Sequence, residues 1–219
     1  MRGLAALLST AWLWSVAMAE PEVIVPFPAP VEDLAQVTKV RSTLIASSLR
    51  SVREHGHIDA YLGKLDVAWH ETILHSVAGV WMPVAAGTAH YRACDALQMS
   101  PVEQMQIGRE VGDRIQGTFL ASMVRAARGA GITPWRALDY THRLYNRLFE
   151  GGGMAVVKLG PKEARVEMAS NPIVGVSYFR NGLRGIYQVA VELFCTKAYV
   201  TNIPSYGTET SCALKISWA

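Results

Sequence analysis

Residues 151–168 read GGGMAVVKLGPKEARVEM, and the hydrophobic pattern of the chain changes at this stretch. Before Gly151 the apolar residues recur with helical spacing, and after it they alternate with polar ones. Ala155–Leu159 and Glu163–Met168 predict two strands, and Gly160-Pro-Lys162 predicts the turn of a hairpin between them. The glycine triplet therefore separates a helical half from a sheet-rich half.

Downstream of the hairpin, the pattern returns to helical spacing once and then to strands. Val174–Cys195 predicts a helix, while Lys197–Asn202 and Thr210–Trp218 predict two further strands. In the last strand one face carries Cys212, Leu214, Ile216 and Trp218. The second half is thus predicted to be ββαββ, an antiparallel sheet with one face covered by a helix.

Upstream, the helical half is predicted to contain about five helices. The clearest start is Ser100-Pro-Val-Glu103, where the serine and glutamate side chains can cap each other's backbone N–H groups. Gly108 and Gly112 share one face of this helix, which predicts close contact with another helix. Trp81-Met-Pro83 is predicted to break the helical run. The predicted helices cover 38–55, 58–80, 83–97, 100–128 and 133–148.

Composition places the chain among globular α/β proteins of the α+β kind. Half of its 219 residues are hydrophobic and 18% are charged, so a core is readily formed and disorder is excluded for most of the chain. A net charge of +3 gives no basis for nucleic-acid binding. The three cysteines show neither disulfide-scaffold nor zinc-module spacing. No apolar run reaches the roughly 20 residues of a membrane span.

The N-terminus has two interpretations. Residues 1–19 fit a secretory signal peptide cleaved before Glu20, or a start assigned too early, with Met18 as the true first residue. The first interpretation predicts export and the second a cytoplasmic protein. Residues 20–37 form a proline-rich lead-in, for which an extended, polyproline-like conformation is expected. The folded part is predicted to be a single domain over 38–219, with halves at 38–150 and 151–219.

Scattered short motifs resemble an uncharacterised protein family found mainly in myxobacteria. The likeness covers about residues 38–219, and that family is distantly similar to vinyl-reductase-like ligand-binding domains and haem-nitric-oxide-binding domains. Those domains also have a helical first half and an α/β second half. The resemblance implies a sensory or small-ligand-binding fold without an established reaction. The motifs are Trp81-Met-Pro83, Ser100–Gly112, Leu148–Gly153, Leu159–Arg165, Tyr178-Phe-Arg180 and the terminal Trp218.

One departure from the haem-binding relatives concerns the cofactor. Those relatives carry Tyr-x-Ser-x-Arg to hold the porphyrin carboxylates, and no such string occurs in this sequence. No motif assigns a proximal histidine either. Haem is therefore not carried over from the resemblance, the cofactor is left unknown, and no catalytic residue is assigned.

The first functional hypothesis is a non-enzymatic sensory or ligand-binding protein. It would hold a small apolar molecule between the helical half and the sheet, since aromatic residues are abundant in the helical half and such residues often line pockets. Ordinary core packing explains the same abundance. The lining residues proposed on this basis are Trp81, His90, Tyr91 and Tyr145.

Two alternatives belong to other classes. A protein–protein interaction module would form a homodimer through the face that carries Gly108 and Gly112. A cysteine-dependent enzyme would use Cys94 as nucleophile and His90, four residues earlier on the same helix face, as base. This pair also supplies two potential metal ligands, but two ligands do not make a site, so no metal centre is predicted.

Two arginine pairs have the spacing of a carboxylate or phosphate clamp. Arg143 and Arg147 share one helix face, as do Arg180 and Arg184. Solvated faces or salt bridges to nearby glutamates explain such pairs equally well. Their role is left open by the sequence.

Overall fold

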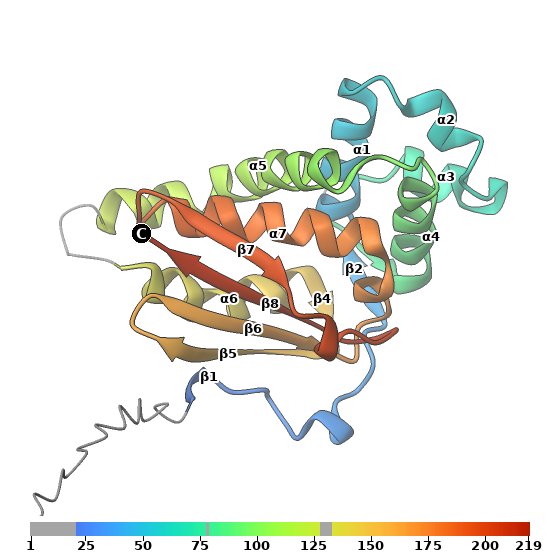
Figure 1. The fold of residues 1–219 in the computed structure, drawn as a ribbon. Helices are drawn as coiled ribbons and strands as arrows, with labels where there is room; N and C mark the ends of the chain where they lie inside the picture. Colours follow the sequence, from blue (N-terminus) through green and yellow to red (C-terminus); the bar gives the residue numbers. More distant parts are fainter. Residues whose placement is uncertain (1–20, 78, 128–132) are drawn as a thin grey trace, which may run out of the picture.

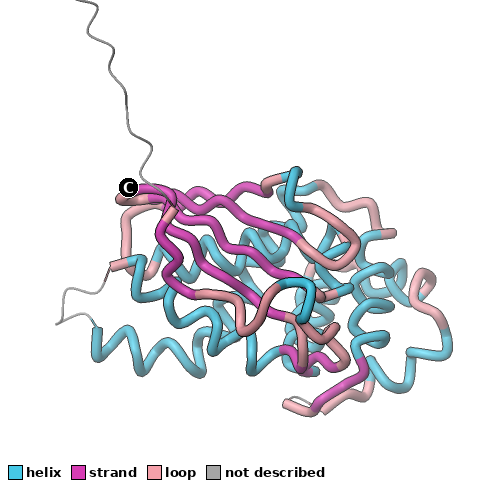
Figure 2. The backbone as a smooth tube through the Cα atoms, turned by 90° about the horizontal axis from the view of Figure 1, so that it is seen from below, coloured by secondary structure: helices cyan, strands magenta, loops and turns pink. Residues whose placement is uncertain are grey.

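The computed structural model describes residues 21–77, 79–127 and 133–219, with side chains throughout these ranges except at 116–127. The leader predicted at residues 1–19 and the predicted end of the 100–128 helix at residue 128 lie outside the described residues. Within them, the structure has helices on one side of an antiparallel sheet (Figures 1 and 2). The predicted α+β class is confirmed. No described helix is long and apolar enough to cross a membrane.

The main sheet has five strands in the order β1-β5-β6-β8-β7, and all neighbours are antiparallel. The predicted hairpin forms β5 and β6, and α7 separates it from β7 and β8, as the ββαββ pattern requires. The edge strand β1 comes from the proline-rich lead-in, so this segment contributes to the sheet rather than only preceding it. The bounds are β1 Glu22–Val25, β5 Gly153–Gly160, β6 Glu163–Ala169, β7 Ala198–Asn202 and β8 Cys212–Trp218.

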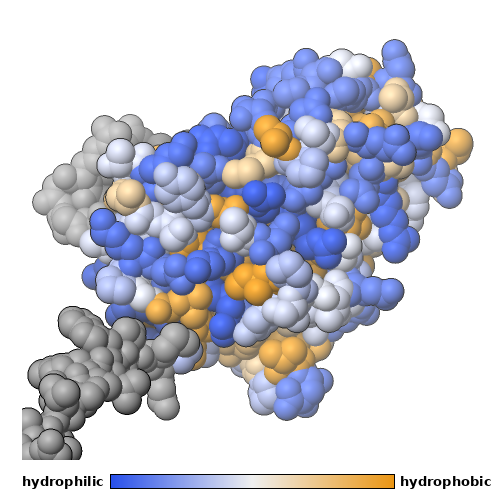
Figure 3. Space-filling view, viewed as in Figure 1, coloured by the Kyte–Doolittle hydropathy of each residue, from blue (hydrophilic) through white to orange (hydrophobic). Residues whose placement is uncertain are grey.

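The two faces of this sheet differ in polarity. Val156, Val166 and Leu214 lie side by side in register and are buried beneath the helices. The face turned to the viewer in Figure 3 is mostly hydrophilic, with small separate hydrophobic patches. Arg165 and Glu167 on that face form an ion pair at 2.6 Å. A sheet covered on one face only accounts for the alternation seen in the sequence.

A second sheet of three very short strands was not predicted. It has the order β3-β2-β4, with β2 at Lys39–Arg41, β3 at Trp81–Pro83 and β4 at Phe149–Glu150. The expected break at 81–83 is therefore a strand, and the first helix begins at Ser42 instead of Thr38. Strands of two or three residues are too short to show alternation, so long-range pairing decides them.

The helices otherwise follow the predicted order, with one correction. The helix predicted over 58–80 is wrong, because the chain forms α2, a 3-10 turn at Val67–Trp69 and α3. The Asp66 side chain accepts a hydrogen bond from the Ala68 N–H at 2.9 Å and so starts a new turn. The helices are α1 Ser42–Glu54, α2 Ile58–Leu62, α3 His70–Leu74, α4 Val84–Asp95, α5 Pro101–Ala127, α6 Pro134–Leu148 and α7 Ser177–Glu192.

Helices α5 and α7 pack closely, and α7 lies between α5 and the sheet (Figure 1). A Cβ atom at Gly108 would lie 1.9 Å from the Gly182 carbonyl oxygen, and one at Gly185 would lie 2.1 Å from the Met105 carbonyl oxygen. The predicted close helix contact at Gly108 and Gly112 is therefore made within the chain. Because α7 covers the face of α5 that carries Gly108 and Gly112, that face is not free to form the predicted homodimer.

Candidate functional site

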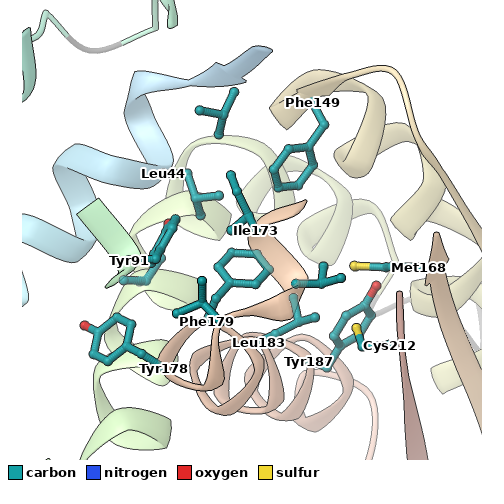
Figure 4. Close-up of a cluster of buried hydrophobic side chains, with 14 of the residues drawn as sticks. Leu44, Tyr91, Phe149, Met168, Ile173, Tyr178, Phe179, Leu183, Tyr187 and Cys212 are labelled. Carbon is teal, nitrogen blue, oxygen red and sulfur yellow. The ribbon is translucent and has the colours of Figure 1, made fainter. Parts of the chain in front are cut away.

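The core contains a cavity of about 50 Å³ at the junction of α1, α5, α6, α7 and the sheet. A second cavity of about 20 Å³ lies next to it, and Phe179 and Leu183 of α7 line both (Figure 4). Helix α7 presents these side chains because its buried residues recur at helical spacing along the face turned to the core. The larger cavity is lined by Leu44, Ile115, Thr141, Leu144, Tyr145, Leu148, Phe149, Met168, Phe179, Leu183, Ile186, Tyr187 and Ala190.

The described residues that form the walls of the larger cavity carry no charge at neutral pH. The titratable groups among them are Tyr145 and Tyr187, and burial raises the pKa of both hydroxyls above the ordinary tyrosine value. The Tyr145 hydroxyl donates a hydrogen bond to the Gly151 carbonyl oxygen at 3.4 Å. The cavity is therefore suited to an apolar molecule rather than to an ion.

Beside the smaller cavity lies a buried polar cluster centred on His90. The Tyr61 hydroxyl is 2.8 Å from His90 Nδ1, and the Cys94 Sγ is 3.7 Å from His90 Nε2. Both His90 and Cys94 are completely buried. Burial lowers the pKa of His90 to about 3 and raises the pKa of the Cys94 thiol. At neutral pH the imidazole is thus neutral and the thiol protonated.

This geometry does not support the cysteine-dependent chemistry. The reactive form of cysteine is the thiolate, and activated cysteines lie in partly exposed surroundings that lower the thiol pKa. Cys94 has the opposite surroundings, since it is fully buried and its pKa is raised by desolvation. Tyr61 holds the position of a third, orienting group beside His90 and Cys94, which the sequence did not identify. Solvent does not reach this pair, however, so the orientation does not make Cys94 a nucleophile. The cluster holds α2 against α4.

The buried imidazole predicts an acid-sensitive fold. In the unfolded chain His90 has an ordinary pKa of about 6.5, so below that pH the unfolded state binds a proton that the folded state excludes down to about pH 3. Stability present above pH 6.5 is therefore lost as the pH falls. Between pH 7.5 and pH 5 we expect His90 to account for a loss of about 2 kcal/mol in unfolding free energy.

Urea unfolding at a series of pH values measures this loss. The His90→Gln variant is the control, because residue 90 then retains hydrogen-bonding capacity but does not titrate, and the rest of the chain is unchanged. We expect the variant to be less stable at pH 7.5 and to have a shallower pH dependence. Equal slopes for the two proteins would contradict a neutral, buried His90.

The structure brings only part of the predicted lining set to the cavities. Tyr145 lines the larger cavity and Tyr91 the smaller one. His90 lies 4.8 Å from Tyr91 between ring centroids but lines neither cavity. Trp81 lies on β3, partly exposed, with the Arg41 guanidinium 3.9 Å above its ring. Phe179 lines both cavities but was not in the predicted lining set, because helical spacing does not distinguish a cavity wall from a packed interior.

A haem group does not fit the two core cavities. The larger cavity is about 50 Å³, far below the roughly 300 Å³ at which pockets for ordinary small molecules begin. His90 is the only fully buried histidine among the described residues, and both of its ring nitrogens already face partners within the chain. The space between the two halves is filled by aromatic side chains, including Tyr91, Phe149 and Phe179 (Figure 4).

Comparison with known proteins supports a likeness of fold. No protein-family model and no curated protein sequence matches the chain. Its fold is similar to that of the Fe(II) unliganded H-NOX protein from K. algicida, with 10% sequence identity, a TM-score of 0.59, and coverage of 82% of this chain and 96% of that one. A mutant of the T. Tengcongensis H-NOX gives 9% identity, a TM-score of 0.53, and coverage of 81% and 97%. At such identities the likeness shows the fold alone, a helical half followed by an antiparallel sheet half as in the haem-nitric-oxide-binding domains.

Proposed function

We propose that this protein is a non-enzymatic sensory or small-ligand-binding protein that holds a small apolar molecule in its core cavity. The observation that carries the proposal is the cavity of about 50 Å³ at the junction of the helices and the sheet, whose described walls are uncharged. The fold that it shares with H-NOX proteins is consistent with a ligand-binding role. Tyr91 and Tyr145 remain the proposed lining residues from the original set.

The size of the cavity limits the ligand. An engineered apolar cavity of about 150 Å³ stays dry and binds benzene or xenon. The larger cavity here has about a third of that volume, and the smaller one adds about 20 Å³ beside it. A ligand of only a few heavy atoms fits, and its affinity would come from transfer out of water and from dispersion contacts with the walls.

A sensory role follows from the origin of the walls. Leu44 and Leu144 come from the helical half, while Met168, Phe179 and Leu183 come from the sheet-rich half. A ligand between them favours the relative position of the two halves that it fits best. The difference between its affinities for the two arrangements sets how far it shifts the population. Occupancy of the cavity would thus be converted into a change in how the halves pack.

Xenon is a suitable probe because it is small and apolar. We expect xenon to shift the NMR signals of residues that line the cavity, and we expect Leu183→Phe to reduce that response about tenfold by filling the space. Leu183 is buried and lines both cavities, so a larger side chain there has no other outlet.

Trp81→Ala is the control variant, because Trp81 lies outside both cavities. It should bind xenon as the natural protein does. Circular dichroism checks that Leu183→Phe is folded. If the folded variant then responds to xenon as strongly as the natural protein does, binding in this cavity is disproved.

A further inference from the structure

We propose that side chains of α7 cap the outer edge of β7 and thereby keep this protein from pairing edge to edge with a second copy of itself. Strand β7 is the last strand of the main sheet, and α7 packs beside it (Figure 1). An uncapped edge presents unpaired backbone N–H and C=O groups, which a strand of another molecule can bind. This proposal does not depend on the core cavity or on the ligand proposed for it.

The backbone groups of β7 alternate between the side facing β8 and the outer edge. The Ile203 N–H, one residue beyond the strand, donates a hydrogen bond to the Ala213 carbonyl oxygen of β8 at 2.9 Å. Successive residues of a strand alternate in direction, so the odd-numbered residues of β7 face β8. The backbone groups of Ala198, Val200 and Asn202 therefore point away from β8, toward the outer edge.

Side chains of α7 bind three of these outward backbone groups. Arg184 Nε donates a hydrogen bond to the Val200 carbonyl oxygen at 3.0 Å. Gln188 Nε2 donates to the Ala198 carbonyl oxygen at 3.1 Å, and Glu192 Oε1 accepts the Ala198 N–H at 3.4 Å. Because these side chains are spaced four residues apart along α7, they share one face of the helix. That face closes the edge of the strand.

The cap also answers a question that the sequence left open, the role of the arginine pair on α7. Arg184 ties α7 to β7 and donates a second hydrogen bond to Asn181 Oδ1 at 3.3 Å. Arg180, one turn earlier, donates to the Ser177 hydroxyl within α7 at 3.4 Å. The two arginines therefore do not act together as a carboxylate clamp, because Arg184 is bound to the strand edge.

The opposite edge of the sheet is protected by other means. Strand β1 is flanked by Pro21 and Pro26, and its register with β5 shifts between Val23 and Val25. Prolines, bulges and charged residues are the usual devices that keep edge strands from pairing. Strand β7 pairs regularly with β8, and residues 198–202 include neither a proline nor a charged residue. The α7 side chains therefore supply the protection that the sequence of β7 lacks.

The strand that would occupy the uncapped edge is β7 of a second copy. Antiparallel pairing about a two-fold axis at Val200 would join the two Val200 residues through both of their backbone groups and place Tyr199 of one copy opposite Thr201 of the other. Tyr199 is 57% exposed, and an aromatic residue opposite a β-branched one is a favourable cross-strand pair. Since residues 198–202 are uncharged, no like charges meet in this pairing.

Removal of the cap should make the protein associate with itself. The double variant Arg184→Met, Gln188→Leu keeps side chains of similar length but removes both donors to the edge, while Glu192 retains its ion pair with Arg109 at 3.0 Å. A second copy then has no side-chain hydrogen bonds to displace from the two carbonyl groups. In sedimentation we expect the variant to associate about tenfold or more tightly than the natural protein. Hydrogen exchange of the outward Val200 N–H should slow about tenfold or more in the associated variant, which locates the contact at β7.

Arg180→Met is the matched control, because it removes an arginine of the same helix whose hydrogen bond is to Ser177 instead of to β7. It should sediment as the natural protein does. Thermal unfolding of each variant separates association through β7 from loss of the fold. If the double variant does not fold, Arg184→Met alone, which frees only the Val200 carbonyl group, decides the question. A folded uncapped variant that associates no more than the natural protein would overturn the proposal, and so would association that leaves exchange of the Val200 N–H unchanged.

Discussion

The Gly108→Ala variant should lose on the order of 3 kcal/mol of unfolding free energy, although alanine is the better helix former. Its Cβ atom would lie 1.9 Å from the Gly182 carbonyl oxygen, which is backbone and does not move aside as a flexible side chain does. Overpacking costs about 1–3 kcal/mol and sometimes more, whereas replacing glycine in a helix gains only about 1 kcal/mol. The clash therefore dominates, and α5 must separate from α7.

Gly112→Ala is the control, because it makes the same chemical change one turn later on α5. A Cβ atom there would lie 3.2 Å from the Ile186 Cα, which a small shift relieves, so we expect a change within about 1 kcal/mol. Urea unfolding measures both variants. Equal midpoints for Gly108→Ala and the natural protein would mean that α5 and α7 do not make this contact. Sedimentation of the natural protein and of Gly108→Ala would then test whether Gly108 contacts a second copy of the chain.

The two halves of the fold could be predicted because each has its own hydrophobic period. The change from helical spacing to alternation at Gly151, and the alternation from Cys212 to Trp218, reflect burial of one sheet face. Burial of one face of a strand makes apolar and polar residues alternate in the sequence. The β2-β3-β4 sheet could not be predicted in the same way. Its strands pair Val40 with Met82 and with Phe149, residues far apart in the sequence, and they are too short for a period.

The candidate site was only partly predictable, for a different physical reason. A cavity is missing volume between side chains, and Leu44 of α1 meets Phe179 of α7 there only after the whole chain has folded. Tyr91 and Tyr145 were found because large aromatic residues tend to border such spaces. Trp81 was placed there on the same argument, yet its ring packs against Arg41 at the surface of β3. Residue type carries no information about which element a side chain will face.

The Phe179→Ala variant should join the two cavities and lose about 3–5 kcal/mol of unfolding free energy. Phe179 lines both cavities, is buried, and contacts Tyr91 with its ring at 4.8 Å between centroids and Phe149 at 6.4 Å. Truncation removes these contacts and leaves a space that the surrounding α1, α5 and α6 cannot close without separating from α7. This is the largest loss that we expect from a single side chain of the site.

The enlarged space should also admit a larger ligand. The natural cavity of about 50 Å³ is too small for benzene, which binds an engineered cavity of about 150 Å³. We therefore expect benzene to raise the thermal midpoint of Phe179→Ala and not that of the natural protein, because a ligand that binds only the folded state stabilises it. Phe179→Leu, which retains most of the volume, should lose less stability and show no response to benzene.

The two measurements together test whether Phe179 separates two spaces or fills a single packed core. If Phe179→Ala loses stability but gains no benzene response, the surrounding helices collapse into the vacated space, and the cavity is then a packing defect rather than a binding site. If benzene restores part of the lost stability, the walls from the helical half and from the sheet-rich half are rigid enough to hold a ligand between them. That rigidity is what a sensory protein requires, because only walls that keep their shape can transmit occupancy from one half to the other.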